Sequence, residues 1–110
     1  MIPIPFIDQN SFIIEASLDD TTYFLRFDWN SEAQLWTMAI QDARSEAVLQ
    51  GVVLVPNTPL LDQFRHLAVP RGEFVVYAQD DNLQIGRDTL LTQSATLYYL
   101  TEAEVAALQS

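Results

Sequence analysis

The chain has 110 residues, which suits a single domain over residues 1–110, and 49% of them are hydrophobic, unlike a disordered segment. Fifteen Asp and Glu oppose five Arg with no Lys, so the formal net charge of −10 disfavours binding to nucleic-acid phosphates or anionic membranes. Cysteine is absent, which excludes a disulfide framework, thiolate catalysis and cysteine-based zinc sites.

The N-terminal segment MIPIPFIDQN has no basic region, and two prolines interrupt its apolar run. No later stretch approaches the roughly 18 apolar residues that a membrane span requires. We therefore expect a soluble protein without a secretory signal. In an extended segment the missing N–H groups of Pro3 and Pro5 face the same side, which predicts an edge strand or the entry of the chain into the sheet.

The clearest β-hairpin lies in the first half of the chain. Apolar and polar residues alternate from Thr22 to Trp29, and the turn residues 30–32 follow. The stretch from Leu35 to Gln41 repeats the alternation. Period two predicts half-buried antiparallel strands. The residues on the predicted buried faces are Tyr23, Leu25, Phe27, Trp29, Trp36, Met38 and Ile40.

Other strands are predicted on both sides of this hairpin. Their ranges are Ser11–Leu18, Ala47–Val55, Glu73–Gln79 and Ala95–Leu100. Asp19 and Asp20 supply a turn, and Gly51 indicates a bulge or a close backbone approach. Thr101 and Glu104 have the spacing of a capping box, which predicts a helical turn or two over Glu102 to Leu108.

The segment between the predicted strands Ala47–Val55 and Glu73–Gln79 has helical rather than strand spacing. Asn57 or Thr58 supplies an N-cap and Pro59 a first helical position, while Pro70 and Gly72 mark the end. The apolar residues at helical spacing are Leu60, Leu61, Phe64 and Leu67. The resulting prediction is a mainly β fold, a small antiparallel barrel or sandwich with one short inserted helix and a C-terminal helical turn.

Val52 to Val55 shows no polar alternation. Either both faces of this segment are buried within the fold, or another chain covers one of them.

A search for catalytic or metal-binding patterns finds none that is complete. His66 is the only histidine, and its place near the end of the predicted helix favours a structural role. The acidic loop from Asp80 to Asp88 suggests a calcium site, but Ile85 and Leu91 occupy the positions where an EF-hand needs Gly and Glu. We predict no metal and no cofactor.

Pairs of acidic residues offer the remaining route to catalysis. Asp19 with Asp20, or Glu15 with Asp28, supplies two carboxylates for acid–base hydrolysis. Acidic residues are common in turns, and no pattern places two of them across a cleft. We therefore predict that the protein is not an enzyme and has no catalytic residues.

A succession of short motifs resembles a known family. The motifs are Trp29-Asn30, Trp36, the run 51–56 (GVVLVP), Leu60-Leu61, the run 64–67 (FRHL), Pro70, Gly72 and the run 97–101 (LYYLT). Together they resemble the small baseplate plug family of contractile-tailed bacteriophages, known from cyanophage-type myoviruses. The resemblance covers Ile2 to Glu104 and departs from the family at Ala68-Val69, where a Leu-Gly pair is expected, and at Leu91, where a glycine is common.

The resemblance implies a virion structural protein at the centre of the baseplate, between the tail tube and the hub and spike. It implies synthesis in the host cytoplasm, other tail proteins as partners, cyclic homo-oligomers within the assembly, and neither a membrane nor a specific nucleic acid as a partner. The predicted assembly segment contains Leu60, Leu61, Phe64, Arg65 and His66. The alternative is a β-barrel module that binds a small ligand or a peptide.

Overall fold

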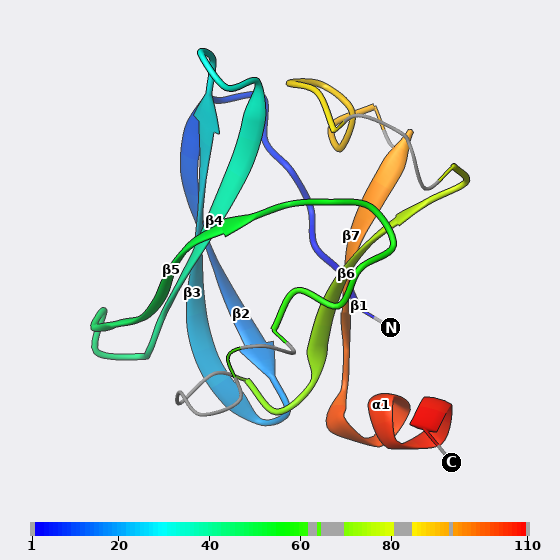
Figure 1. Cartoon of the computed structure of the whole chain (residues 1–110). Helices are drawn as coiled ribbons and strands as arrows, with labels where there is room; N and C mark the ends of the chain where they lie inside the picture. Colours follow the sequence, from blue (N-terminus) through cyan, green and yellow to red (C-terminus); the bar gives the residue numbers. More distant parts are fainter. Residues whose placement is uncertain (1, 62–63, 65–69, 81–84, 93, 110) are drawn as a thin grey trace.

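The computed structural model describes residues 2–61, 64, 70–80, 85–92 and 94–109, and most of these belong to two antiparallel β-sheets (Figure 1). The strands are β1 (Ile2–Pro3), β2 (Ser11–Leu18), β3 (Thr21–Asn30), β4 (Leu35–Gln41), β5 (Ala47–Val53), β6 (Glu73–Ala78) and β7 (Ala95–Leu100). A helix, α1 (Glu102–Gln109), follows β7. The larger sheet has the order β2-β3-β4-β5, and the smaller has the order β1-β7-β6.

The predicted hairpin forms the centre of the larger sheet. Trp29 of β3 lies opposite Trp36 of β4, and the alternate residues of both strands point into the core as predicted. β2 pairs with β3 along its whole length through a two-residue turn, in which Asp19 and Asp20 have φ angles of 51° and 64°. These left-handed conformations are those of a type I′ turn, which matches the twist of the strands it joins.

The bulge predicted at Gly51 is present. Its φ of 75° lies in the left-handed region, and the pairing of β4 with β5 shifts register there, between Leu49 and Val52, and again between Ala47 and Leu49. β5 ends at Val53, two residues before the predicted end of this strand. The extra residue bends β5, which weakens its outer edge as a template for further pairing.

The smaller sheet places the N-terminal strand at its edge. Ile2 pairs with Tyr99 and Pro3 with Tyr98, so β1 adds to one side of β7 while β6 occupies the other. The edge strand predicted from the two prolines is confirmed.

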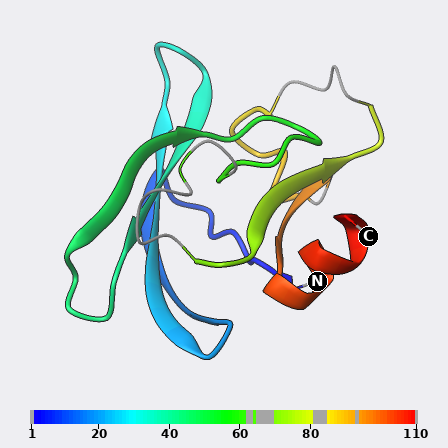
Figure 2. The same cartoon turned by 60° about the horizontal axis from the view of Figure 1, so that its bottom comes forward.

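The two sheets face each other, as Figures 1 and 2 both show, and enclose one core. Large side chains from both sheets fill the space between them. Those that are fully buried include Leu18, Leu25, Phe27, Trp36, Met38, Ile40, Phe74, Val76, Leu97 and Tyr99. The sheets do not close into a barrel, since each keeps its own two edge strands among the described residues. Of the two predicted arrangements, the sandwich fits and the barrel is wrong.

The segment after β5 crosses from the larger sheet to β6, where it lies along the strand rather than opening as a helix (Figure 1). Pro56 forms a parallel bridge with Val76, and the Asn57 N–H donates to the Val76 carbonyl at 2.8 Å. The Leu60 N–H then donates to the Phe74 carbonyl at 3.0 Å. Hydrogen bonds to the unpaired edge of β6 thus override the local helical spacing at these positions.

Most of the predicted inserted helix, residues 62–63 and 65–67, lies outside the described residues. The Phe64 N–H donates to the Leu61 carbonyl at 2.9 Å, which is the i to i−3 bond of a 3₁₀ turn.

The predicted capping box at the start of α1 is confirmed. The Glu104 N–H donates to Thr101 Oγ1 at 3.3 Å, while Glu104 Oε1 accepts the Thr101 N–H at 3.1 Å. Glu102 and Glu104 also place negative charge in the first turn, where it favours the helix dipole. No helix in the described part of the chain has the length and apolar character needed to cross a membrane.

Candidate assembly surfaces

The predicted assembly segment begins inside the core. Leu61 is fully buried and Leu60 is only 5% exposed, while Phe64 is half-buried and packs against the core. The Leu61 N–H donates to the buried carboxylate of Glu73 at 2.6 Å, which fixes the chain there. Arg65 and His66 lie outside the described residues. The role of the segment in assembly stays a prediction, and at least its first two residues contribute to the stability of the domain.

The apolar run before this segment alternates between core and surface. Val52 and Leu54 are buried, whereas Val53 and Val55 are 40% and 38% exposed. One of the two alternatives left open by the sequence is therefore excluded, because the two faces are not both buried within the fold. The exposed side chains of Val53 and Val55 form an apolar face that a partner chain can cover.

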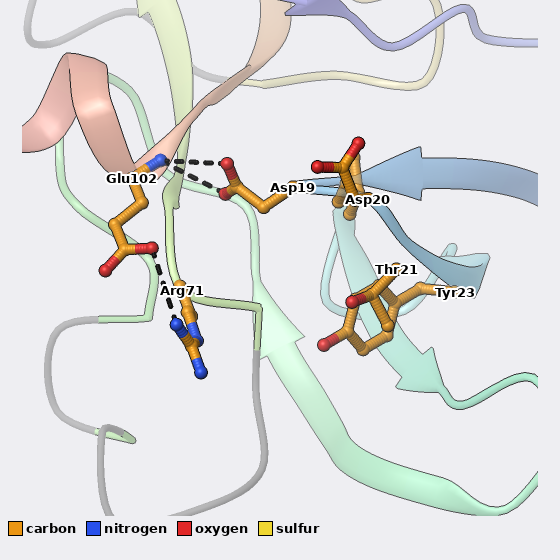
Figure 3. A pocket seen from close by; sticks show the side chains of 7 residues that line it. Asp19, Asp20, Thr21, Tyr23, Arg71 and Glu102 are labelled. Carbon is orange, nitrogen blue, oxygen red and sulfur yellow. Dashed lines mark hydrogen bonds and ion pairs between the residues drawn. The ribbon is translucent and has the colours of Figure 1, made fainter.

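A cavity of about 620 Å³ opens where the turn between β2 and β3 meets the start of α1 (Figure 3). Arg71 and Glu102 lie on one side of it, with the Asp20, Thr21 and Tyr23 side chains on the other. Asp19 reaches between the two sides toward Glu102.

Asp19 joins the two sheets through its carboxylate. Asp19 Oδ2 accepts a hydrogen bond from the Tyr99 hydroxyl at 2.6 Å and another from the Glu102 N–H at 3.1 Å. The Tyr99 hydroxyl itself accepts from the Gly72 N–H at 2.8 Å. Burial raises the pKa of Tyr99 far above its ordinary value, and the hydrogen bond to Asp19 raises it further. The hydroxyl therefore stays protonated and serves as a structural donor.

The remaining groups of the cavity are poorly placed for catalysis. The Arg71 to Glu102 ion pair is 3.8 Å long, and both side chains are more than half exposed, so water screens it. The pKa of Tyr23 is raised, because the effect of burial outweighs the opposite effect of the nearby Arg71. Three or more metal-ligating side chains do not gather anywhere among the described residues. This cavity is a depression of the surface lined mainly by polar side chains.

The other predicted carboxylate pair is not arranged across a cleft. Asp28 accepts a hydrogen bond from the Ser11 hydroxyl at 2.6 Å and forms an ion pair with Arg26 at 3.1 Å. Glu15 lies on β2 opposite Phe24, beyond this cluster. The Asp80 to Asp88 loop is described only in part, since residues 81–84 lie outside the described residues, and the Asp88 carboxylate pairs with Arg87 at 3.4 Å.

Comparison with known protein families decides the broader identity. The family model described as "Cyanophage baseplate Pam3 plug gp18" matches residues 1–102. The chain belongs to this baseplate plug family. A search of curated proteins found no match. Membership in the plug family confirms the resemblance drawn from the short sequence motifs, and it implies a structural, non-enzymatic role in the tail baseplate of a bacteriophage.

For a plug protein, the informative surfaces are those that meet other baseplate or tail proteins. The sequence motifs pointed to the segment around Phe64, but they missed the link between Asp19 and Tyr99 because the two residues are 80 positions apart. They also missed the open edge of β2. The alternation of Ser11–Leu18 indicated it, because a strand with one exposed face and no proline or lysine is a candidate for further pairing.

Proposed function

We propose that this protein is a component of the central baseplate hub, where it joins or seals the end of the tail tube against the hub and spike. The observation that carries this proposal is the family match, which spans residues 1–102 and describes a plug. A plug must contact the proteins around it, so we further propose tube, hub and spike proteins as its partners and cyclic symmetry for its copies in the assembly.

The charge of the chain supports a place on the path of the DNA. A formal net charge of −10 without any Lys repels the phosphate backbone, so the protein offers passing DNA few places to bind. Three of the arginines, Arg26, Arg71 and Arg87, lie within ion-pairing distance of carboxylates, which further reduces positive potential at the surface.

Location in the virion tests the proposal directly. We would add a small epitope tag after Ser110 and label purified tails with antibody-bound gold particles for electron microscopy. Label at the junction of tube and baseplate supports the proposal, whereas label along the sheath or at the head contradicts it. Particles lacking the gene should have tails that fail to close at this junction, as seen by cryo-electron microscopy.

The effect of charge needs a separate measurement. Neutralising exposed acids such as Asp20 and Glu46 with Asn and Gln should slow DNA ejection from phage that assemble normally. Unchanged ejection kinetics would contradict the proposal that the acidic charge aids the passage of DNA. The proposed structural role as a plug would not be affected.

The contribution of the predicted assembly segment is tested at Phe64. If the half-buried ring serves mainly as core, Phe64→Ala should lower the free energy of unfolding by about 3 kcal/mol. If the isolated variant keeps its stability and yet is missing from purified tails, the ring is an interface residue.

The alternative of a β-barrel module that binds a small ligand or a peptide lacks the barrel that it requires. The sheets do not form a barrel, and large side chains such as Phe27, Trp36 and Phe74 fill the space between them.

A further inference from the structure

Three of the four sheet edges are protected against further pairing. β1 is two residues long and ends in Pro3, which has no N–H to donate. The edge of β6 is covered by the chain from Pro56 to Leu60. β5 is distorted by the register shifts beside Gly51. Natural proteins use such devices to prevent edge-to-edge association.

Among the described residues, the fourth edge, that of β2, has none of these devices. β2 pairs with β3 without interruption from Ser11 opposite Asp28 to Leu18 opposite Thr21. Its eight residues include no proline, glycine or lysine, and no register shift bends it. A long, regular edge that no described segment covers is a template on which another strand can form.

The direction of the backbone groups of β2 follows from its pairing. The Trp29 N–H donates to the Asn10 carbonyl at 2.7 Å, so Asn10 and every second residue after it direct their backbone groups to β3. The intervening residues direct their N–H and C=O groups outward, and they are Ser11, Ile13, Glu15 and Ser17. All four are exposed, and within the described ranges no backbone partner is found for them.

The side chains along β2 also suit an added strand. Ile13 is 53% exposed on the outer face. On the inner face Ile14 and Ala16 pack against the core but remain half-buried, because nothing in the described part of the chain pairs beyond β2. A fifth strand would cover Ile14 and Ala16 on one face and lie beside Ile13 on the other, so it would bury apolar surface on both faces.

Charge decides which kind of strand fits. Glu15 projects from the middle of this edge, and the chain carries a formal net charge of −10. A second copy aligned on the same edge would bring an equal negative charge, which opposes association. An extended segment with Lys or Arg is attracted instead, since oppositely charged pairs on adjacent strands stabilise a sheet.

We propose that the edge of β2 binds an extended, cationic segment of another baseplate protein, which adds as a fifth strand to the β2-β3-β4-β5 sheet. The identity of the partner as a baseplate protein rests on the proposed function, whereas the binding mode rests on the geometry of β2 alone. Main-chain hydrogen bonds to Ser11, Ile13, Glu15 and Ser17 supply the affinity, and a basic residue beside Glu15 sets the preference.

The probe for this mode is a synthetic peptide of about ten residues in which valine alternates with lysine, matched to a peptide that alternates valine with glutamate. Calorimetric titration should detect binding of the lysine peptide but not of the glutamate peptide. The affinity for the lysine peptide should fall as salt is added. Backbone amide NMR shifts should concentrate on Ser11, Ile13, Glu15 and Ser17. Shifts confined to β5, or equal binding of both peptides, would contradict the proposal.

Variants at Ile13 test the hydrogen bonds at the outer edge of β2 without disturbing the fold. Ile13→Pro removes an outward N–H and spares the bonds to β3, so the domain should remain folded by circular dichroism while the peptide binds at least about tenfold more weakly. Ile13→Thr keeps the N–H and the β-branched shape, and it should bind within about twofold of the original chain. Equal binding by the proline variant would overturn the proposal.

A second variant, Glu15→Lys, tests the proposal even if Ile13→Pro unfolds the domain. Glu15→Lys leaves every backbone group in place but should weaken the lysine peptide and strengthen the glutamate peptide. Analytical ultracentrifugation tests the competing outcome, in which a second copy of the chain occupies the edge. If the original chain forms dimers and Ile13→Pro abolishes them, a second copy binds there, and the proposal of a cationic partner is contradicted.

Incorporation into virions separates this inference from the proposed function. If the original chain is absent from purified tails, the proposed function fails. If the original chain and Ile13→Pro are incorporated equally, the plug role stands and the β2 edge is not used. The proposal requires the original chain and Ile13→Thr in tails, with Ile13→Pro largely lost from them.

Discussion

The Tyr99 hydroxyl donates a hydrogen bond of 2.6 Å to the carboxylate of Asp19, and this contact connects the smaller sheet to the hairpin turn of the larger one. The same hydroxyl accepts the Gly72 N–H, and the same carboxylate accepts the Glu102 N–H. One phenol and one carboxylate therefore hold together the turn after β2, the approach to β6 and the start of α1. The stability of this end of the sandwich depends on both groups.

Tyr99→Phe should lower the free energy of unfolding by about 1 to 3 kcal/mol, because the Gly72 N–H and the Asp19 carboxylate each lose a partner. Urea denaturation followed by tryptophan fluorescence measures this change. Tyr98→Phe is the matched control, since Tyr98 lies next in sequence, on the opposite face of β7, and should change stability by less than about 0.5 kcal/mol. Equal effects of the two changes would mean that the hydroxyl of Tyr99 contributes little.

Alkaline pH should destabilise the fold. The pKa of Tyr99 in the folded state is raised by burial and by the Asp19 hydrogen bond, and that of Tyr23 is raised by burial. A raised folded pKa gives stability that is fully present below the ordinary tyrosine pKa of about 10 and is lost as pH rises through the folded value. Urea midpoints should fall above about pH 10, and Tyr99→Phe should flatten that decline. An equally steep decline in this variant would point to other groups.

The β2 to β3 turn is strained at its second position. Asp20 has a φ of 64° and is exposed, and a left-handed conformation costs an ordinary residue about 1 kcal/mol. Asp20→Gly creates the Asp-Gly sequence that type I′ turns prefer and should raise the melting temperature, with a gain of about 0.5 kcal/mol. Asp19→Gly is the contrasting variant: its φ of 51° also favours glycine, yet loss of its carboxylate should make the net effect destabilising.

Local patterns predicted the strands because the alternation of apolar and polar residues along a strand involves only neighbouring residues. The ranges of β2, β4 and β7 match the predicted ranges, since alternation alone marks a strand whose one face is buried. The capping box at Thr101 likewise depends on residues three positions apart. The helical spacing after Pro59 misled at Leu60 and Leu61, because the edge of β6 supplied hydrogen-bonding partners that the local sequence does not reveal.

The same reasoning explains what the sequence missed about possible interfaces. Asp19 and Tyr99 meet only because two sheets stack, and no periodic pattern spans 80 residues. The open edge of β2 is likewise a property of topology, since it exists because β3 lies on one side of β2 and nothing described pairs on the other. Family membership supplied the role in the baseplate, while the sheet order showed which strands lie at the edges.

Leu61 and Val53 differ sharply in burial although both lie in the apolar stretch after the middle of β5. Leu61 is fully buried, so Leu61→Ala should cost about 2 to 5 kcal/mol of unfolding free energy through lost burial and the cavity it leaves. Val53 is 40% exposed, and Val53→Ala should cost less than about 1 kcal/mol. Chemical denaturation of both variants checks the contrast, and similar losses would contradict the assignment of Leu61 to the core.

Of the three glycines in the chain, Gly72 has the least space for a side chain. A Cβ atom built there would collide with the Leu100 carbonyl oxygen and approach the Tyr99 ring to 2.6 Å, and the backbone oxygen cannot move without disturbing the pairing of β6 with β7. Gly72→Ala should therefore cost about 3 kcal/mol or more and also weaken the Gly72 hydrogen bond to Tyr99. Gly86→Ala is the control, because its Cβ would meet only Thr89 Oγ1 at 3.4 Å, and its stability should change by less than about 1 kcal/mol. Thermal unfolding compares the two variants, and a stable Gly72→Ala domain would show that β6 and β7 separate more easily at this point than their packing indicates.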